Sequence, residues 1–475
     1  MVPERFRPVI DAVEPVAARL RDGGYRTYLV GGVVRDLFMD EAGGRTAEGD
    51  LDLTTDAHPS QVKAAIGDIV DALWTQGETF GTIGCRLGGH TFEITTHRAE
   101  IYRGDSRKPD VTFGDDVDHD LSRRDFTINA MALEVTAHGH AELIDPHGGL
   151  ADLTARRLRT PLDPALSFGD DPLRMMRAAR FIARFGLTPD DALVDAVKEM
   201  ADRLSIVSAE RVRDELDKLV VVGDPRDGMW FLVRTGLTDH FLPELPALEV
   251  EQDPIHRHKD VLAHTIAVVN NVRPGAVAAG REIDLRLTRL AALFHDVAKP
   301  ATRAVGPDGV SFHHHEVVGA RMTRNRMRAL KYSNDDVSAV SELVYLHLRF
   351  HTYRMGWSDR AVRRYVRDAG DLLPELNVLT RCDCTTRNRR KAEALSLRMD
   401  ELEDRIVALA SQEELDAMRP DLDGNQIMSH LSIGPGREVG EALQFLLDLR
   451  LDEGPLGPEE ATRRLDAWWA ERGEA

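Results

Sequence analysis

Residues 29–36 read LVGGVVRD, and this stretch decides how the N-terminal part of the chain folds. Two strand-forming residues precede the pair Gly31-Gly32, so the stretch predicts a strand, a tight turn and a helix start. Such a turn exposes backbone N–H groups to an anion, and Arg35 can add a charge-assisted contact to a phosphate. Because most glycine pairs after strands are only turns, this interpretation depends on the neighbouring residues.

Three carboxylates on predicted strands form a candidate metal site. Asp50 and Asp52 flank Leu51, and residues two apart on a strand point to the same face. Their charges repel unless a cation lies between them, and Mg²⁺ takes oxygen ligands together with substrate phosphates. Glu93 lies on another predicted strand, residues 91–95, and three such carboxylates suit two-metal phosphoryl transfer. A solvated acidic strand edge is the alternative for the aspartates alone.

The predicted elements change character along the chain. Residues 5–21 have helical spacing, and residues 25–30, 51–53, 84–87 and 91–95 are strand candidates. From about residue 170 the pattern becomes helical almost to the end. The fold class predicted is therefore α+β, with a mixed head followed by an all-α body.

Length, cysteine content and hydropathy limit the classes of protein that fit. A chain of 475 residues has room for several domains, and its three cysteines cannot form a disulfide framework. No uninterrupted apolar run reaches the roughly 18 residues of a membrane span, and the N-terminus lacks the apolar core of a signal peptide. We therefore expect a cytoplasmic protein without a membrane partner.

The charge is uneven along the chain. A net charge of −19 argues mildly against nucleic-acid binding, because phosphate contacts need lysine and arginine. One basic concentration nevertheless follows Asp171-Pro172, a pair suited to a helix start. Its members fall within an arc of roughly 120° on a helix, so they form one basic face. They are Arg174, Arg177, Arg180 and Arg184. A solvated basic face is the alternative.

A set of histidines and aspartates in the second half suggests a metal centre. His264 lies on an apolar helical stretch, and His295-Asp296 lies within the hydrophobic run 290–300, which we predict to be helical. Burying either side chain without a partner costs several kcal/mol, and shared metal coordination removes that cost. A lone histidine of this kind is usually a hydrogen-bonded core residue. The series continues with His315, His347 and Asp383.

The head motifs resemble a known family. The Gly-Gly-x-x-Arg-Asp stretch followed by Asp-x-Asp looks like the head of the polymerase-β-type nucleotidyltransferases. Residues 122–132, SRRDFTINAMA, are similar to the second motif of the class II (bacterial and eukaryotic) CCA-adding enzymes and their poly(A) polymerase relatives. The resemblance covers roughly residues 25–245. It implies that Arg124, Asp125 and Asn129 bind the phosphates and the ribose of a nucleotide.

A further motif implies how the base is chosen. Residues 170–174 resemble the Glu-Asp-x-x-Arg motif with which class II enzymes read the incoming base, although Asp170 replaces the glutamate. Cytosine and adenine present an amino donor beside a ring-nitrogen acceptor. A carboxylate at Asp171 and a guanidinium at Arg174 match that edge, whereas uracil and guanine present the reverse pattern. Arg177 and Arg180 are further candidates for nucleotide binding.

Two more resemblances concern the body of the protein. Residues 208–216 resemble the family's last shared motif, to which we assign a structural role supporting the neck. The histidine–aspartate series looks like the HD phosphohydrolase superfamily, whose helical bundle binds one or two divalent metals. The resemblance implies a first ion on His264, His295, Asp296 and Asp383 and a second on His315 and His347. The metal's identity, and whether this domain hydrolyses phosphoesters such as 2′,3′-cyclic phosphates or is only structural, stay open.

Together these patterns predict a CCA-adding tRNA nucleotidyltransferase that uses CTP, ATP and Mg²⁺, with tRNA as its partner and no DNA. A poly(A) polymerase, an enzyme adding only CC or only A, and an RNA-binding regulator with an inactive head are the alternatives. We expect a nucleotidyltransferase head at 1–150, a helical neck and body for base reading and RNA binding at 151–250, an HD domain at 251–395 and a helical tail at 396–475.

Overall fold

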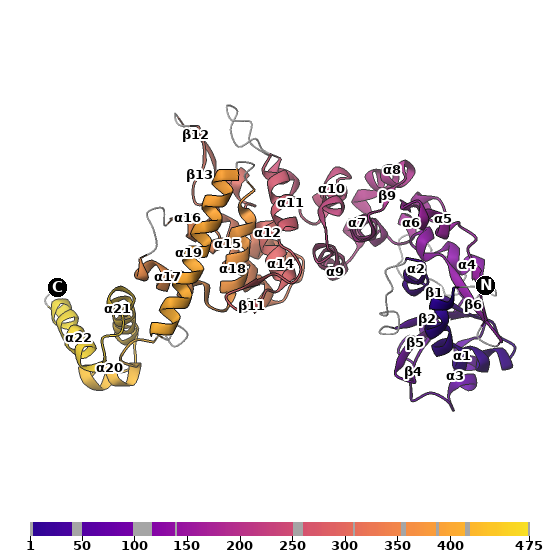
Figure 1. Cartoon of the computed structure of the whole chain (residues 1–475), viewed down its shortest axis with the longest axis horizontal. Coiled ribbons are helices and arrows are strands. Elements are labelled where there is room, and N and C mark those ends of the chain that lie inside the picture. Colours follow the sequence, from indigo (N-terminus) through magenta and orange to yellow (C-terminus); the bar gives the residue numbers. More distant parts are fainter. Residues whose placement is uncertain are drawn as a thin grey trace. The chain divides into compact units, whose positions relative to one another are not determined.

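The computed structural model describes residues 3–39, 50–97, 116–137, 140–249, 260–306, 309–352, 358–385, 389–413 and 419–473. The chain divides into two compact units, Met1–Phe241 and Leu242–Ala475, whose elements are labelled in Figure 1. Within the described ranges, no helix is both long enough and apolar enough to cross a membrane.

A seven-stranded sheet forms the centre of the first unit. Its strand order is β3-β4-β5-β2-β1-β6-β7, and only the β2–β5 pair is parallel among these seven strands. The strands are β1 (Thr27–Val30), β2 (Leu51–Thr55), β3 (Ala72–Trp74), β4 (Thr82–Leu87), β5 (His90–Thr96), β6 (Ala132–Thr136) and β7 (His140–Ile144). The register places Asp52 directly beside Glu93.

The two faces of this sheet have different roles. Leu29, Leu53 and Ile94 point into a core built with α1 (Arg7–Asp22), α2 (Gly32–Phe38) and α3 (Pro59–Ile66). Side chains alternate along a strand, so Asp52 and Glu93 point to the opposite face. On that face Tyr28 and Val30 pack against α4 (Val117–Ser122).

Helices follow the sheet in the first unit. They are α5 (Gly149–Thr154), α6 (Pro164–Asp170), α7 (Leu173–Phe185), α8 (Asp191–Met200), α9 (Ala209–Val220) and α10 (Arg226–Arg234), with a short parallel pair formed by β8 (Arg157–Leu158) and β9 (Thr188–Pro189). Helix α7 packs against both α9 and α10. A side chain at Gly228 of α10 would come within 2.4 Å of the Ala179 carbonyl oxygen, so the glycine permits this close packing.

The second unit is largely helical. Helix α12 (Leu285–Phe294) contacts α11 (Val261–Asn271), α15 (Asn334–Leu346) and α18 (Leu373–Asp383). The bundle also contains α13 (Lys299–Thr302), α14 (His315–Ala329), α16 (Arg349–Thr352), α17 (Asp359–Ala369) and α19 (Arg389–Glu413). Two hairpins accompany it, β10 (Val277–Ala278) with β11 (Arg281–Glu282) and β12 (Arg303–Gly306) with β13 (Gly309–Phe312).

The last three helices, α20 (Gly424–Leu431), α21 (Arg437–Glu453) and α22 (Pro458–Gly473), have a small core of their own. Ile427, Leu446 and Leu465 lie at its centre, and Phe445 stacks on Trp468 with the ring centroids 5.0 Å apart.

The α+β class predicted from the sequence is confirmed, with two local corrections. Strand β2 begins at Leu51, so Asp50 lies directly before the strand and not on it. Helix α12 ends at Phe294, so His295-Asp296 follows the helix instead of lying inside it. Beyond Phe294 the backbone forms turns, in which Val297 N donates to the Phe294 carbonyl at 3.0 Å and Lys299 N donates to the Asp296 carbonyl at 2.9 Å. The boundaries at residues 150, 250 and 395 stay predictions.

Candidate active site

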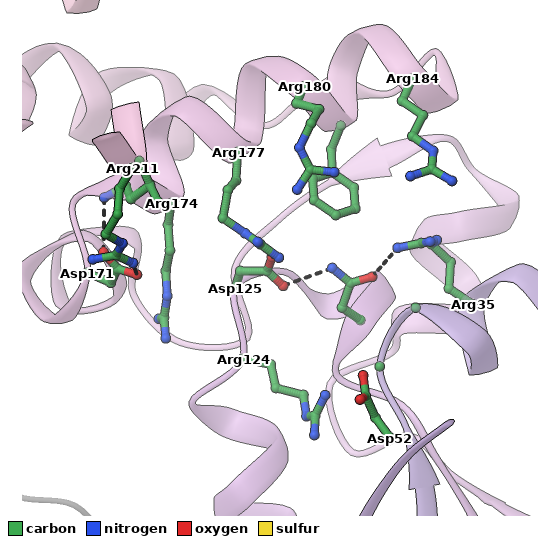
Figure 2. Close-up of a pocket in the computed structure, with 15 residues that line it drawn as sticks. Arg35, Asp52, Arg124, Asp125, Asp171, Arg174, Arg177, Arg180, Arg184 and Arg211 are labelled. Atoms are coloured by element: carbon green, nitrogen blue, oxygen red, sulfur yellow. Dashed lines mark hydrogen bonds and ion pairs between the residues drawn. The ribbon is translucent and has the colours of Figure 1, made fainter. Parts of the chain in front are cut away.

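A cavity of about 450 Å³ in the first unit brings together all ten predicted nucleotide-binding residues (Figure 2). Its walls come from the β1–α2 turn, the beginning of β2, the 123–129 segment and the charged face of α7. The lining residues are Gly31, Gly32, Arg35, Asp52, Arg124, Asp125, Asn129, Asp171, Leu173, Arg174, Arg177, Arg180, Phe181, Arg184 and Arg211.

The glycine turn has the conformation that its sequence predicts. Strand β1 ends at Val30, Gly31 has a φ of 80°, and α2 begins at Gly32. A side chain at Gly31 would lie 3.2 Å from Asp52 Oδ2 and 3.4 Å from Arg124 Nη1. Glycine is therefore required both by the left-handed backbone and by the close approach of Asp52.

Two of the three predicted catalytic carboxylates, Asp52 and Glu93, lie side by side on one face of the sheet. Asp52 and Glu93 are neighbours across β2 and β5, and both line a second cavity of about 450 Å³. The protein raises the pKa of Asp52 through desolvation and then through the charges of Glu93 and Asp50, while Arg124 opposes this shift. A bound cation would remove that repulsion, which fits these residues to a metal. The three carboxylates do not, however, come within 4.8 Å of one another as a set.

Four side chains form a continuous hydrogen-bonded row beneath α7. Arg177 Nε donates to Asp125 Oδ2 at 2.8 Å, and Asn129 Nδ2 donates to Asp125 Oδ1 at 2.9 Å. Arg35 Nη1 donates to Asn129 Oδ1 at 2.6 Å. Burial alone would raise the pKa of Asp125, but Arg177 and Asn129 hold it below its usual value. Asp125 is therefore a charged hydrogen-bond acceptor at neutral pH.

Figure 2 shows the arginines of α7 along one side of the cavity, as their spacing predicts. Arg180 Nε donates to Glu215 Oε2 at 2.7 Å, and Glu215 Oε1 lies 3.9 Å from Arg177 Nη1. Glu215 is buried on α9, in the motif to which the sequence assigns a structural role. Because this carboxylate holds two cavity arginines, α9 also shapes the site.

The structure shows a different arrangement around Asp171 from the one we expected. Asp171 Oδ1 accepts from the Leu173 backbone N at 3.2 Å, and Asp171 Oδ2 accepts from Arg211 Nη2 at 2.9 Å. Arg174 donates instead to Ser167 Oγ at 2.8 Å and to the Arg123 carbonyl. Asp171 and Arg174 both line the cavity, but sequence reasoning missed Arg211, which lies beside them (Figure 2). The only feature of the sequence that could have pointed to Arg211 is its position within the 208–216 motif.

A second site lies in the Leu242–Ala475 unit, where all six predicted HD ligands come together. Within the described ranges, the structure contains two groups of ligating atoms that each lie within 4.8 Å of one another. One is His264, His295 and Asp383, and the other is Asp296, His315 and His347. Asp296 Oδ2 lies 3.2 Å from His295 Nε2 and Asp296 Oδ1 lies 3.4 Å from His315 Nε2. Asp296 therefore faces both groups, whereas we expected it in the first alone.

Three of these histidines are held in the orientation that metal binding requires. The Nδ1 atoms of His295, His315 and His347 lie 2.8, 2.7 and 2.6 Å from backbone carbonyl oxygens, which accept only. A neutral ring held in this way directs an unprotonated Nε2 toward the cluster. Asp296 and Asp383 outweigh the effect of burial and raise the pKa of His295 to about 10, so a metal ion would have to displace the Nε2 proton of this histidine. Nε2 of His315 and of His347 is buried without a hydrogen-bond partner. A metal ion would satisfy both atoms, so the residues present fit a divalent cation.

The charges at this second site agree with that interpretation. Burial alone would raise the pKa values of Asp296 and Asp383, but their histidine neighbours hold both well below their usual range. Lys299 Nζ also donates to Asp296 Oδ2 at 2.7 Å. The centre therefore combines two charged carboxylates, four histidines and one nearby cation.

Three families match successive parts of the chain. A family described as "Poly A polymerase head domain" matches residues 27–159, and "Probable RNA and SrmB- binding site of polymerase A" matches residues 186–248. The family "HD domain" matches residues 261–414. The two candidate sites lie in regions that these families cover, except for residues 160–185 of the first site.

Whole-chain comparisons give the same result. A solved structure of the Bacillus stearothermophilus CCA-adding enzyme with CTP has a TM-score of 0.69 at 21% identity and covers 100% of both chains. A CCA-adding enzyme of Lactobacillus helveticus is 37% identical over 47% of this chain and 53% of its own. An A-adding tRNA nucleotidyltransferase of Deinococcus radiodurans is 32% identical over 98% of both chains. Because the similarity to this last relative extends over nearly the whole length, the chain belongs to the class II CCA-adding tRNA nucleotidyltransferase and poly(A) polymerase family and carries a C-terminal HD domain.

Proposed function

We propose that the first unit adds C, C and A from CTP and ATP to the 3′ end of tRNA without a nucleic-acid template. The observation that carries this proposal is the single cavity in which Asp52, Asp125 and Asp171 lie along a row of arginines. Such a cavity offers a catalytic carboxylate, a sugar-binding acceptor and a base-reading acceptor to one nucleotide. CCA-adding enzymes solved with CTP, ATP and tRNA-CCA share the fold.

Base choice follows from hydrogen-bond polarity. Asp171 can accept from the exocyclic amino group of cytosine or adenine, and Arg174 can donate to the adjacent ring nitrogen. Arg211 contacts Oδ2 of Asp171 in a partly exposed ion pair. Ion pairs of this kind contribute about 1 kcal/mol or less to stability. The Asp171 carboxylate can therefore give up this contact and accept a hydrogen bond from the amino group of the nucleobase at little cost in free energy. Uracil and guanine would leave both protein groups unpaired.

The other contacts position the sugar and the phosphates. Asp125 and Asn129 can bond the ribose hydroxyl groups, while Arg35, Arg124 and the Gly31 turn face the phosphates. Nucleotidyltransferase and HD domains generally use divalent metals. In the head we propose Mg²⁺ held by Asp50, Asp52 and Glu93, where it would polarise the attacking 3′-hydroxyl and stabilise the leaving pyrophosphate.

A narrower activity is the second candidate. The relative that matches nearly the whole chain is an A-adding enzyme, whereas the CCA-adding relative named above matches about half of it. This observation favours addition of the terminal A alone over poly(A) addition. Since the base-reading residues suit both C and A, we propose the full sequence of additions as the main function.

One experiment separates these activities. Transcripts of one tRNA that end before CCA, after C and after CC are incubated with each nucleoside triphosphate separately. We expect CTP to extend the first two and ATP to extend the third by one residue. Extension of the CC transcript alone would show an A-adding enzyme, and repeated addition of A would show a poly(A) polymerase. No extension of any transcript would contradict nucleotide addition.

For the second unit we propose a divalent metal site that hydrolyses phosphoesters such as 2′,3′-cyclic phosphates. The support is the preorganised set of Nε2 and carboxylate atoms and the nearby Lys299, which can face a phosphate. The test is metal-dependent opening of a 2′,3′-cyclic phosphate by water to a 2′- or 3′-phosphomonoester, with His295→Ala as the inactive control. We place both activities in the cytoplasm, where tRNA, CTP and ATP are found together.

A further inference from the structure

The four arginines on the cavity face of α7 differ in how their charges are compensated. Arg177 is paired with Asp125 and Arg180 with Glu215. Arg174 donates to Ser167 Oγ. No carboxylate of a described residue lies within ion-pair distance of Arg184, whose guanidinium instead lies 4.9 Å from the centre of the Phe185 ring. The positive charge of Arg184 is therefore available to an anionic ligand.

A second cation lies on the same aromatic ring. The Arg35 guanidinium is 4.4 Å from the centre of the Phe185 ring, and Arg35 is largely buried. Burial lowers the pKa of Arg35, and the nearby charge of Arg184 lowers it further, against the opposing effect of Asp36. Two guanidinium groups at one ring repel each other, and an anion contacting both would convert that repulsion into two charge-assisted contacts.

The position of this pair along the cavity identifies the part of the nucleotide that it faces. Arg174 and Arg184 are separated by ten residues of one helix, or about 15 Å. Figure 2 shows Arg174 with Asp171 at one end of the row, and Arg184 with Arg35 at the other. If the base lies at Asp171 and the ribose at Asp125, the phosphates extend toward Arg35 and Arg184.

We propose that Arg184, together with Arg35, binds the terminal phosphates of the incoming nucleoside triphosphate and retains the pyrophosphate when it leaves. The proposal rests on the nucleotidyl transfer proposed above. In that reaction the RNA 3′ oxygen loses its proton to solvent and bonds to the α-phosphorus. The bond from the α-phosphorus to the bridging oxygen breaks, and that oxygen leaves with pyrophosphate. Arg184 also lines a neighbouring cavity of about 540 Å³ with Arg180 and Lys218, which offers the product a cationic route outward.

The test measures binding of inorganic pyrophosphate to the full chain by titration calorimetry in magnesium buffer, without RNA. The variants are Arg184→Ala and Arg184→Lys, with Arg234→Ala as the matched control. Arg234 is also exposed and lies 5.0 Å from the centre of the Trp230 ring, but it does not line the cavity. The same variants are titrated with CMP, which lacks the terminal phosphates.

We expect Arg184→Ala to weaken pyrophosphate binding about tenfold, the usual effect of losing one hydrogen bond to a charged group. Arg184→Lys should fall between this variant and the wild type, and CMP binding should change less than about twofold in all three. Unchanged pyrophosphate affinity in Arg184→Ala, or an equal loss in Arg234→Ala or in CMP binding, would overturn the proposal. Because no RNA is present, these outcomes do not depend on whether the acceptor is tRNA.

Discussion

Replacing Glu215 by glutamine tests whether α9 organises the nucleotide cavity. The side chains of Glu215 and Arg180 are 3% and 10% exposed, and they are joined by a 2.7 Å contact. Glutamine keeps the shape and one acceptor oxygen but removes the charge, so Arg180 is left buried without its counter-ion. Removing one partner of a buried ion pair costs about 3 kcal/mol at the lower end of the usual range.

The consequence can be measured in two ways. For a unit of this size a loss of about 3 kcal/mol lowers the melting temperature by roughly 6–12 °C, which calorimetry of the full chain resolves. Because Arg177 and Arg180 both line the cavity, the KM for ATP should also rise by roughly five- to tenfold. The matched control is Glu210→Gln, the same chemical change at an exposed position of α9.

A melting temperature for Glu215→Gln within about 1 °C of that for Glu210→Gln would show that the pair contributes little to stability. An unchanged KM for ATP would show that the positions of Arg177 and Arg180 do not depend on α9. Either result would exclude the role assigned here to Glu215.

Three further results are expected. Asp52→Ala should abolish nucleotide addition while leaving the far-ultraviolet circular dichroism unchanged, and full activity in that folded variant would exclude the metal site. His295→Ala should lower the metal content of the purified protein, measured by mass spectrometry, yet leave nucleotide addition within about twofold, because the HD ligands lie outside the cavity in the first unit. The folded pKa of Asp125 lies below its unfolded value of about 4, so this group stabilises the protein above that pH, and its contribution is lost as the pH falls through the folded pKa. Urea titrations between pH 5 and pH 3 should therefore show a smaller loss of stability in Asp125→Asn than in the wild type, and equal losses would contradict the charged Asp125–Arg177 pair.

The sequence predicts the features that depend on local chemistry. The β1–α2 turn requires a left-handed residue beside Asp52, and Gly31 provides it. The arginine row follows from the period of a single helix. The HD ligands are recognised because histidine and aspartate in apolar stretches need partners, although more than one hundred residues separate His264 from Asp383.

Contacts between distant elements could not be predicted in the same way. The pair Arg180–Glu215 joins α7 to α9 across 35 residues, and the pair Asp171–Arg211 joins α9 to a residue two positions before α7 across 40 residues. The sequence around an arginine does not determine which distant aspartate or glutamate forms an ion pair with it. The strands β3, β6 and β7 were not predicted. Ala72–Trp74 is only three residues long, and buried and exposed side chains do not alternate regularly along Ala132–Thr136 or His140–Ile144.

Base choice by the Asp171–Arg174 wall of the cavity can be measured directly. Single-turnover incorporation from CTP, ATP, UTP and GTP is measured with the wild type, Asp171→Ala and Arg174→Ala, using the tRNA transcripts that end before CCA and after CC. The wild type should prefer C and A by roughly 10⁴ or more, because the disfavoured bases leave buried polar groups unpaired. Arg174→Ala should lose both this preference and much of its rate, and Asp171→Ala should accept UTP and GTP more readily relative to CTP and ATP. Wild-type selectivity in both variants would contradict the account, since the base would then have to be read elsewhere.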